Sequence, residues 1–190
     1  MTARTHDVFA FASLLTVAGI SPPSGINLIT LMSCLVGNIV GALIPDMDQA
    51  GNRLWDLLPL GDHLAKVFRK IFYKHRTLTH SLVGMFLIYK LLDYALPKFI
   101  NSHMVDVNLL TISIMIGYIS HLIADSLTKE GLPLFFPIGF ELGFPPIRAL
   151  RITTGKWQEK YLVFPVVGIY IVFISYVFNA ELVSILRQVH

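Results

Sequence analysis

The stretch Leu109–Leu127, LLTISIMIGYISHLIADSL, is long and apolar enough to cross a membrane as one helix. It carries no charged side chain before Asp125. His121 and Asp125 are four residues apart near its end, so both project from the same helical face. Ionisable side chains are costly at membrane depth and are usually functional there. The stretch therefore predicts a membrane-spanning helix with a polar site at one end.

The composition of the whole chain agrees with the integral membrane class. Of its 190 residues, 54% are hydrophobic and 14% are charged, and the mean hydropathy is +0.65. Soluble domains are about 45–50% apolar and about 25% charged. Too few charges are present to cover a water-soluble surface, and the length fits one domain, so we expect a single all-α membrane domain over residues 1–190. The lone cysteine, Cys34, excludes an internal disulfide and a thiolate metal site.

About five transmembrane helices are expected, over residues 7–20, 26–44, 78–96, 109–127 and 161–178. The connections 45–77 and 128–160 hold six and five of the 15 Lys and Arg residues, whereas those on the opposite side hold only Lys98. By the positive-inside rule, the two long loops and the N-terminus are cytoplasmic. The sequence thus predicts a multi-pass protein with a cytoplasmic N-terminus.

Two segments of the long loops are expected to be associated with the membrane without crossing it. LAKVFRKIFYK, residues 64–74, has the pattern of a basic amphipathic helix lying near anionic lipid, or of an amphipathic helix packed on protein. LPLFFPIGFELGFPPI, residues 132–147, is apolar but is broken by Pro and Gly, which excludes a spanning helix. It fits a re-entrant or interfacial loop, or a buried cover over a site.

Histidines and aspartates gather at the predicted cytoplasmic ends of four helices. Singly, they fit hydrogen-bonded pairs, solvated turns or basic residues that meet lipid phosphate. Their convergence from four segments on one membrane face indicates instead a shared metal site. The residues concerned are His6 before the first helix, Asp46 and Asp48 after the second, His75 and His80 at the start of the third, and His121 and Asp125 in the fourth.

Imidazole and carboxylate ligands without thiolate suit Zn²⁺, Mn²⁺ or Fe²⁺. The ligands exceed one tetrahedral shell, so one or two ions are expected. The use of such a centre is hydrolysis, in which the ion acidifies water and stabilises charge on the reacting oxygens. Asp48 or Asp125 is the expected general base, and Arg76 is expected to hold a phosphate or another anionic group.

Four motifs between Thr5 and Gly131 together resemble the YdjM-like family of inner-membrane proteins described as metal-dependent hydrolases: THDVFAF, GALIPDMD, HRTLTHS and GYISHLIADSLTKEG. The resemblance implies a protein of the bacterial inner (cytoplasmic) membrane with a metal-dependent activity. By position, its pattern matches the seven His and Asp residues named above. It also matches TGKWQE to a later element of the family, which implies Glu159 as an added ligand.

A site at headgroup depth beside a basic amphipathic segment predicts hydrolysis of an ester or phosphoester in a lipid or lipid-linked substrate. A metal or proton transporter is the first alternative, but that class places ionisable groups near the bilayer midplane, often within repeats. A non-catalytic membrane scaffold with a structural metal is the second. No nucleic-acid partner is expected, because topology already explains the net charge of +3 and the loop lysines. No oligomeric state is predicted.

Overall fold

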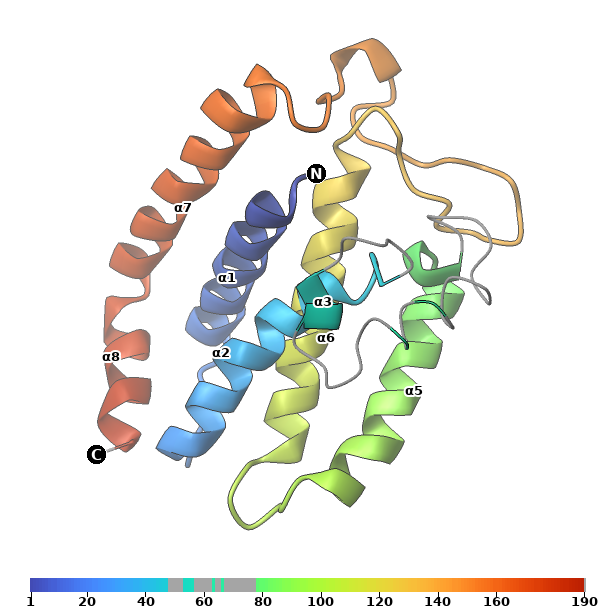
Figure 1. Ribbon diagram of the computed structural model, residues 1–190. Coiled ribbons are helices and arrows are strands. Elements are labelled where there is room, and N and C mark those ends of the chain that lie inside the picture. The colour runs from blue at the N-terminus through green and yellow to red at the C-terminus, as the bar shows by residue number, and fades with distance from the viewer. Residues whose placement is uncertain (48–52, 57–62, 64–65, 67–77, 190) are drawn as a thin grey trace.

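The computed structural model describes residues 1–47, 53–56, 63, 66 and 78–189, and the described chain is a helical assembly without strands (Figure 1). All five predicted segments fall on helices. The elements are α1 (Ala3–Ile20), α2 (Leu28–Leu43), α3 (Arg53–Asp56), the 3₁₀-helix η1 (Leu78–His80), α5 (Leu82–Phe99), α6 (Val107–Ser126), the 3₁₀-helix η2 (Arg148–Leu150), the π-helix η3 (Glu159–Val163), α7 (Phe164–Val177) and α8 (Asn179–Gln188).

Helix α6 is the centre of the fold. It packs against α1, α2 and α5, while α7 lies on the far side of α1 (Figure 1). The most apolar 18-residue window of α6 is 56% buried, against 11% for the window in Glu159–Val177. The helix that the sequence marks most clearly as polar at one end is therefore also the one that neighbouring helices enclose.

Small residues bring α2 and α6 into backbone contact. A Cβ atom added at Gly41 would lie 2.0 Å from the Ile114 carbonyl oxygen, and one added at Gly117 would lie 1.9 Å from that of Asn38. Beside this seam, the Asn38 side-chain amide donates to the Ser113 carbonyl at 3.2 Å. Close approach through glycine together with interhelical hydrogen bonds is typical of helices that associate in lipid.

Two helical segments of the described chain are long and apolar enough to cross a membrane, Val107–Ser126 and Glu159–Val177. Helix α2 is apolar but shorter, with 16 residues. Helix α5 carries Lys90, Asp93 and Lys98 in its sequence, and α1 carries Arg4 and Asp7, which lowers their apolar character. The expectation of an all-helical protein is confirmed, whereas the count of five spans is not.

Several predicted helix boundaries were wrong. Helix α1 begins at Ala3, so His6 lies inside the helix rather than ahead of it. The third helix does not begin at Leu78: η1 comes first, and the hydroxyl of Ser81 caps α5 by accepting from the Gly84 N–H at 3.1 Å. Pro97 does not end α5, because a proline near the last turn removes only one helical hydrogen bond. Helix α8 was missed.

The chain between α6 and α7 is irregular. It is held by isolated bridges that pair Thr128 with Ile152 and Leu132 with Leu142. Leu132 is buried in the core, but most of the larger apolar side chains that follow face outward, with Ile138 67% and Phe144 65% exposed. This exposure argues against the buried cover among the predicted alternatives. Apart from Lys66, the predicted amphipathic segment 64–74 lies outside the described residues.

Candidate metal centre

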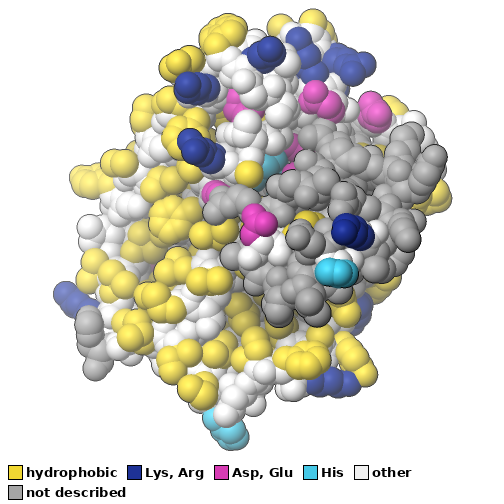
Figure 2. All heavy atoms as spheres, in the orientation of Figure 1, with side chains coloured by type: hydrophobic (Ala, Val, Ile, Leu, Met, Phe, Trp, Pro, Cys, Tyr) yellow, Lys and Arg dark blue, Asp and Glu magenta, His cyan; other side chains and the backbone are white. Residues whose placement is uncertain are grey.

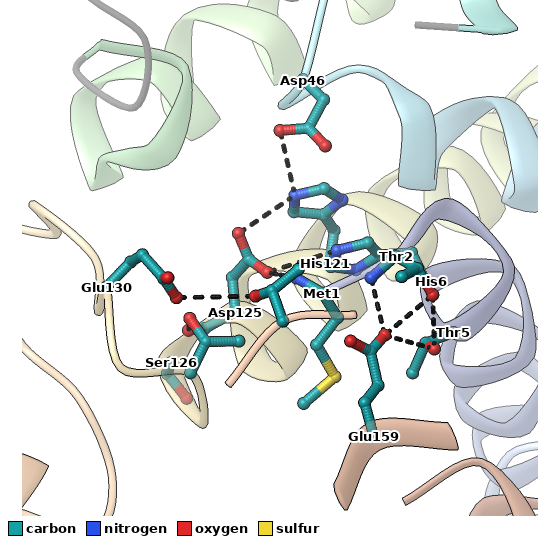
Figure 3. Close-up of polar contacts among 12 residues, drawn as sticks. Met1, Thr2, Thr5, His6, Asp46, His121, Asp125, Ser126, Glu130 and Glu159 are labelled. Atoms are coloured by element: carbon teal, nitrogen blue, oxygen red, sulfur yellow. Dashed lines mark hydrogen bonds and ion pairs between the residues drawn. The ribbon is translucent and has the colours of Figure 1, made fainter. Parts of the chain in front are cut away.

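Four elements bring polar side chains together at one end of the helical assembly (Figure 3). His6 projects from the second turn of α1, and Asp46 lies in the turn that follows α2. His80 is the last residue of η1, and His121 and Asp125 occupy successive turns of α6. Because α6 packs against α1 and α2, the side chains of His6 and Asp46 lie beside those of His121 and Asp125. The convergence expected from the sequence is thus present for these five residues.

Asp46 and Asp125 are surrounded by imidazole nitrogens. The His6 Nε2 atom lies 3.2 Å from Asp125 Oδ1, and the His121 Nε2 atom lies 3.8 Å from Asp125 Oδ2. Asp46 Oδ1 is 3.4 Å from His80 Nε2 and 3.7 Å from His121 Nε2. The N-terminal amine of Met1 also contacts Asp125 Oδ1. Two carboxylates and three imidazoles therefore share one small volume.

The imidazole rings are fixed by neighbours outside this volume. His121 Nδ1 lies 2.7 Å from the Ala42 carbonyl oxygen, so that nitrogen carries the proton and Nε2 is left with a lone pair. The His6 ring stacks on the His121 ring, with centroids 3.7 Å apart and planes 8° from parallel. His80 Nδ1 lies 3.1 Å from the hydroxyl oxygen of Thr79. Such support sets the orientation and tautomer of metal-binding histidines.

The donor set fits a divalent cation. His6 Nε2, His121 Nε2 and Asp46 Oδ1 are buried and have no hydrogen-bond partner among the described residues, although buried polar atoms are normally paired. Ligand atoms of His6, Asp46 and His121 lie within 4.8 Å of one another, as do those of His80, His121 and Asp125. Nitrogen and carboxylate donors of this kind suit zinc, manganese or iron. Both groups include His121, so the described residues form one centre with overlapping ligands.

Asp46 is the most accessible member of the centre. Its side chain is 21% exposed, whereas those of His80 and Asp125 are fully buried. Burial would raise the pKa of Asp46, but the nearby imidazoles of His80 and His121 outweigh burial and hold the pKa below its ordinary range. Asp46 is therefore an anionic donor at neutral pH.

The structure places Glu159 beside the centre, with other partners. Its carboxylate accepts hydrogen bonds from Thr2, Thr5 and Gly155, and neither group of metal-capable residues includes it. Figure 3 shows it pointing at the start of α1. The other three residues predicted for the site, Asp48, His75 and Arg76, lie outside the described residues.

Sequence reasoning missed the groups that support the centre. Tyr118 is fully buried, and its hydroxyl donates to the Thr79 carbonyl, which ties η1 to α6. A signal was available, because Tyr118 precedes His121 by three residues and Asp125 by seven and so lies on the same face of α6. The Ala42 carbonyl had no such signal, since only the fold brings it to His121.

Comparison with known proteins gives one family and no solved structure. The sequence model of the family described as YdjM inner membrane protein matches residues 1–182. "Uncharacterized protein YvsG" of Bacillus subtilis (strain 168) is 32% identical over 163 residues, which cover 84% of this chain and 86% of that protein. "Inner membrane protein YdjM" of Escherichia coli (strain K12) is 29% identical over 127 residues. These cover 65% of this chain but 58% of that protein, so the chain matches less than two thirds of its length. No solved structure gives a significant match.

Proposed function

The chain belongs to the YdjM inner membrane protein family, and from that premise we propose that it is a membrane-bound metal-dependent hydrolase of an ester or phosphoester. The observation that carries the proposal is the convergence of three imidazoles and two carboxylates, from four elements, on one buried volume. Five donors placed in this way are difficult to explain by packing alone, because each polar group would be buried at a cost.

The residues of the candidate metal centre have different proposed roles. His6, Asp46, His80, His121 and Asp125 would hold the ion, with His121 contributing to both donor groups. When bound, the ion would acidify water and stabilise negative charge on the reacting oxygens. The Ala42 carbonyl holds the His121 ring in one tautomer, and the stacked ring of His6 limits its rotation. Asp48, or Asp125 where the other donors complete the coordination shell, remains the proposed general base, and Arg76 the proposed anchor for an anionic group.

The accessibility of Asp46 favours an enzyme over a scaffold with a structural metal. Structural sites are closed by protein ligands, whereas catalytic sites keep one position open. Among the described ligands, burial is complete or nearly so except at Asp46, whose side chain is 21% exposed. Substrate would reach the ion from that side.

A substrate within the membrane surface fits the position of the centre. Asp125 lies in the last turn of α6, a helix long enough to span the membrane, so the ligands lie at headgroup level. We propose a lipid or lipid-linked ester or phosphoester at the cytoplasmic face, with the N-terminus on that side and five helices in the membrane. A metal or proton transporter is less favoured, because its ionisable groups would lie nearer the midplane.

The first test is elemental analysis of detergent-purified protein. We expect one or two equivalents of zinc, manganese or iron in the wild type and loss of that metal in the double variant His80→Ala/Asp125→Ala. The matched control is His103→Ala/Asp93→Ala, which removes the same residue types from exposed positions elsewhere. Metal-loaded wild type and the control should then hydrolyse phospholipid in mixed micelles, and the site variant should not. A folded wild type that takes up none of these metals would refute the proposal.

A further inference from the structure

An outward-facing apolar surface lies between α6 and α7, on residues the hydrolase proposal does not use. In soluble monomeric proteins, large exposed apolar patches mark sites that bind a protein or a membrane. Its members are between 45% and 67% exposed, and we call them the α6–α7 surface: Phe135, Ile138, Phe140, Phe144, Ile147 and Leu150. Trp157 and Tyr161, 65% and 68% exposed, continue it toward α7. We expect these exposed side chains to be covered by another apolar or amphipathic medium.

Basic side chains accompany the apolar ones. Arg148, Lys156 and Lys160 are exposed, and Lys129 is half-buried, whereas the exposed acids of the segment are Glu130 and Glu141. Figure 2 shows dark-blue basic side chains beside yellow apolar ones at this end of the molecule. Aromatic and aliphatic side chains flanked by Lys and Arg are typical of protein surfaces that lie among anionic phospholipids.

The backbone of the segment sets its depth. It has bridges and turns in place of a helix, so its carbonyl groups are not all paired within the chain. Irregular backbone exposed to lipid does not occur in the hydrocarbon region, where no water can satisfy it. The segment therefore belongs in the hydrated headgroup layer, with only its side chains directed toward the acyl chains.

Arg151 holds the α6–α7 surface in place. It is 8% exposed, and its guanidinium donates to the carbonyls of Pro145, Gly143 and Pro146 at 2.8, 3.0 and 3.2 Å. It also passes so close to Gly143 that an added Cβ would lie 2.3 Å from Arg151 Nη1. By donating to these three carbonyls, the buried arginine holds the backbone of residues 143–146 in one conformation.

We propose that the α6–α7 surface is a preformed contact with anionic phospholipid headgroups of the membrane that the chain occupies. Lys129, Arg148, Lys156 and Lys160 meet the phosphates, and the aromatic and aliphatic side chains insert just below them. This contact does not depend on hydrolysis or on a bound metal. It gives the metal-bearing end of α6 a fixed depth in the membrane.

Trp157 is a built-in reporter of this contact. The sequence contains two tryptophans, and Trp55 is 6% exposed, so Trp55→Phe leaves the exposed Trp157 as the only tryptophan, which is excited selectively over the tyrosines. The full chain is reconstituted in nanodiscs of phosphatidylglycerol or phosphatidylcholine brominated at a shallow or a deep acyl position. We expect stronger quenching by shallow than by deep bromines, and stronger quenching by the anionic lipid. Since each basic residue near an anionic surface contributes about fivefold to binding, the double variant Lys156→Gln/Lys160→Gln should reduce the anionic preference by about 25-fold.

Two further reporters make the outcome decisive. In the background Trp55→Phe/Trp157→Phe, Phe144→Trp should repeat the shallow pattern. Ile169→Trp, at a 70% exposed position near the middle of Glu159–Val177, should be quenched best by deep bromines. Indoles at 144 and 157 that are open to aqueous acrylamide and insensitive to brominated lipid would overturn the proposal. So would shielding from both quenchers, which would mean that protein covers the surface, or a depth equal to that of the Ile169→Trp control.

Discussion

Replacing Glu159 should loosen the beginning of α1 without removing a member of either metal-capable group. Glu159 is 2% exposed, and its Oε1 accepts from the Thr2 N–H at 2.6 Å, the Thr2 hydroxyl at 2.8 Å and the Thr5 hydroxyl at 2.6 Å. Its Oε2 accepts from the Gly155 N–H at 2.6 Å. The Thr2 side chain makes no capping bond of its own, so a carboxylate distant in sequence caps α1.

The cost follows from these four bonds. A hydrogen bond to a charged group contributes about 1.5–3 kcal/mol, and donors that share one carboxylate do not add fully. Part-buried Thr2 can turn to water, whereas buried Thr5 cannot, so we expect Glu159→Ala to lower the free energy of unfolding by about 3 kcal/mol. Glu159→Gln keeps an acceptor oxygen for Thr2 and Thr5, but its amide NH₂ group would face the Gly155 N–H, which is also a donor. We expect this variant to lower the free energy of unfolding by about 1.5 kcal/mol.

Cys34 offers a direct assay. It is the only cysteine and is 8% exposed, so a thiol-reactive fluorophore labels the chain in proportion to the unfolded fraction. Titration with sodium dodecyl sulfate in detergent micelles should rank the wild type above Glu159→Gln and Glu159→Ala below both. Glu141→Ala, at an exposed position in the same connection, should match the wild type.

The metal content of the Glu159 variants distinguishes a capping role of this residue from a role as a metal ligand. If Glu159 acts only through α1, Glu159→Gln retains the wild-type metal content, because His6 stays in place. Glu159→Ala weakens metal binding only as far as it loosens the helix that carries His6. A folded Glu159→Gln protein that has lost its metal as completely as His121→Ala would refute this reasoning and make Glu159 a ligand.

Other changes test the seam and the centre. Gly117→Ala places a Cβ 1.9 Å from a backbone oxygen and should destabilise the protein by about 3 kcal/mol in the Cys34 assay. Gly168→Ala, whose Cβ would have nothing within 4 Å, should be neutral or stabilising. Equal effects of the two variants would contradict the close contact of α2 and α6. Asn38→Ala should cost about 1 kcal/mol, because it removes the bond to the Ser113 carbonyl, and Asn108→Ala on the exposed end of α6 should cost less. Chelation should lower the thermal unfolding temperature, and added metal should raise stability by about 1.4 kcal/mol per tenfold increase above Kd, in the wild type but not in His121→Ala. A wild type indifferent to chelator would argue against a resident ion.

The pattern of α6 was readable from the sequence, because hydropathy and an i, i+4 pair are local properties. Its helical character and the facing of His121 and Asp125 follow from residues within one helix, whereas its buried position depends on the helices that pack around it. The approach of His6 and Asp46 could be inferred only from topology, by assuming that alternate helix ends share one side of the membrane.

The partners of buried groups could not be predicted, because they depend on packing between distant segments. Glu159 has the chemistry of a ligand, and only the fold shows that Thr2, Thr5 and Gly155 surround its carboxylate. Helix boundaries were misplaced for a related reason. The start of α1 was predicted from the first apolar residues. The helix begins earlier, with a turn that contains polar residues, and the fold buries Thr5 and His6 of that turn.

The α2–α6 seam also has a consequence for biosynthesis. Asn38 and Ser113 are separated by 75 residues, and ribosomes deliver the chain from its N-terminus, so α2 enters the membrane well before its partner exists. Until α6 has been made, the Asn38 amide lacks the Ser113 carbonyl as an acceptor, and the backbone at Gly41 lacks the helix against which it packs. Helix α2 must therefore wait beside the insertion machinery or in contact with lipid. A nascent chain arrested before Val107 should be exposed to quality-control proteases, and one released after Ser126 should escape them.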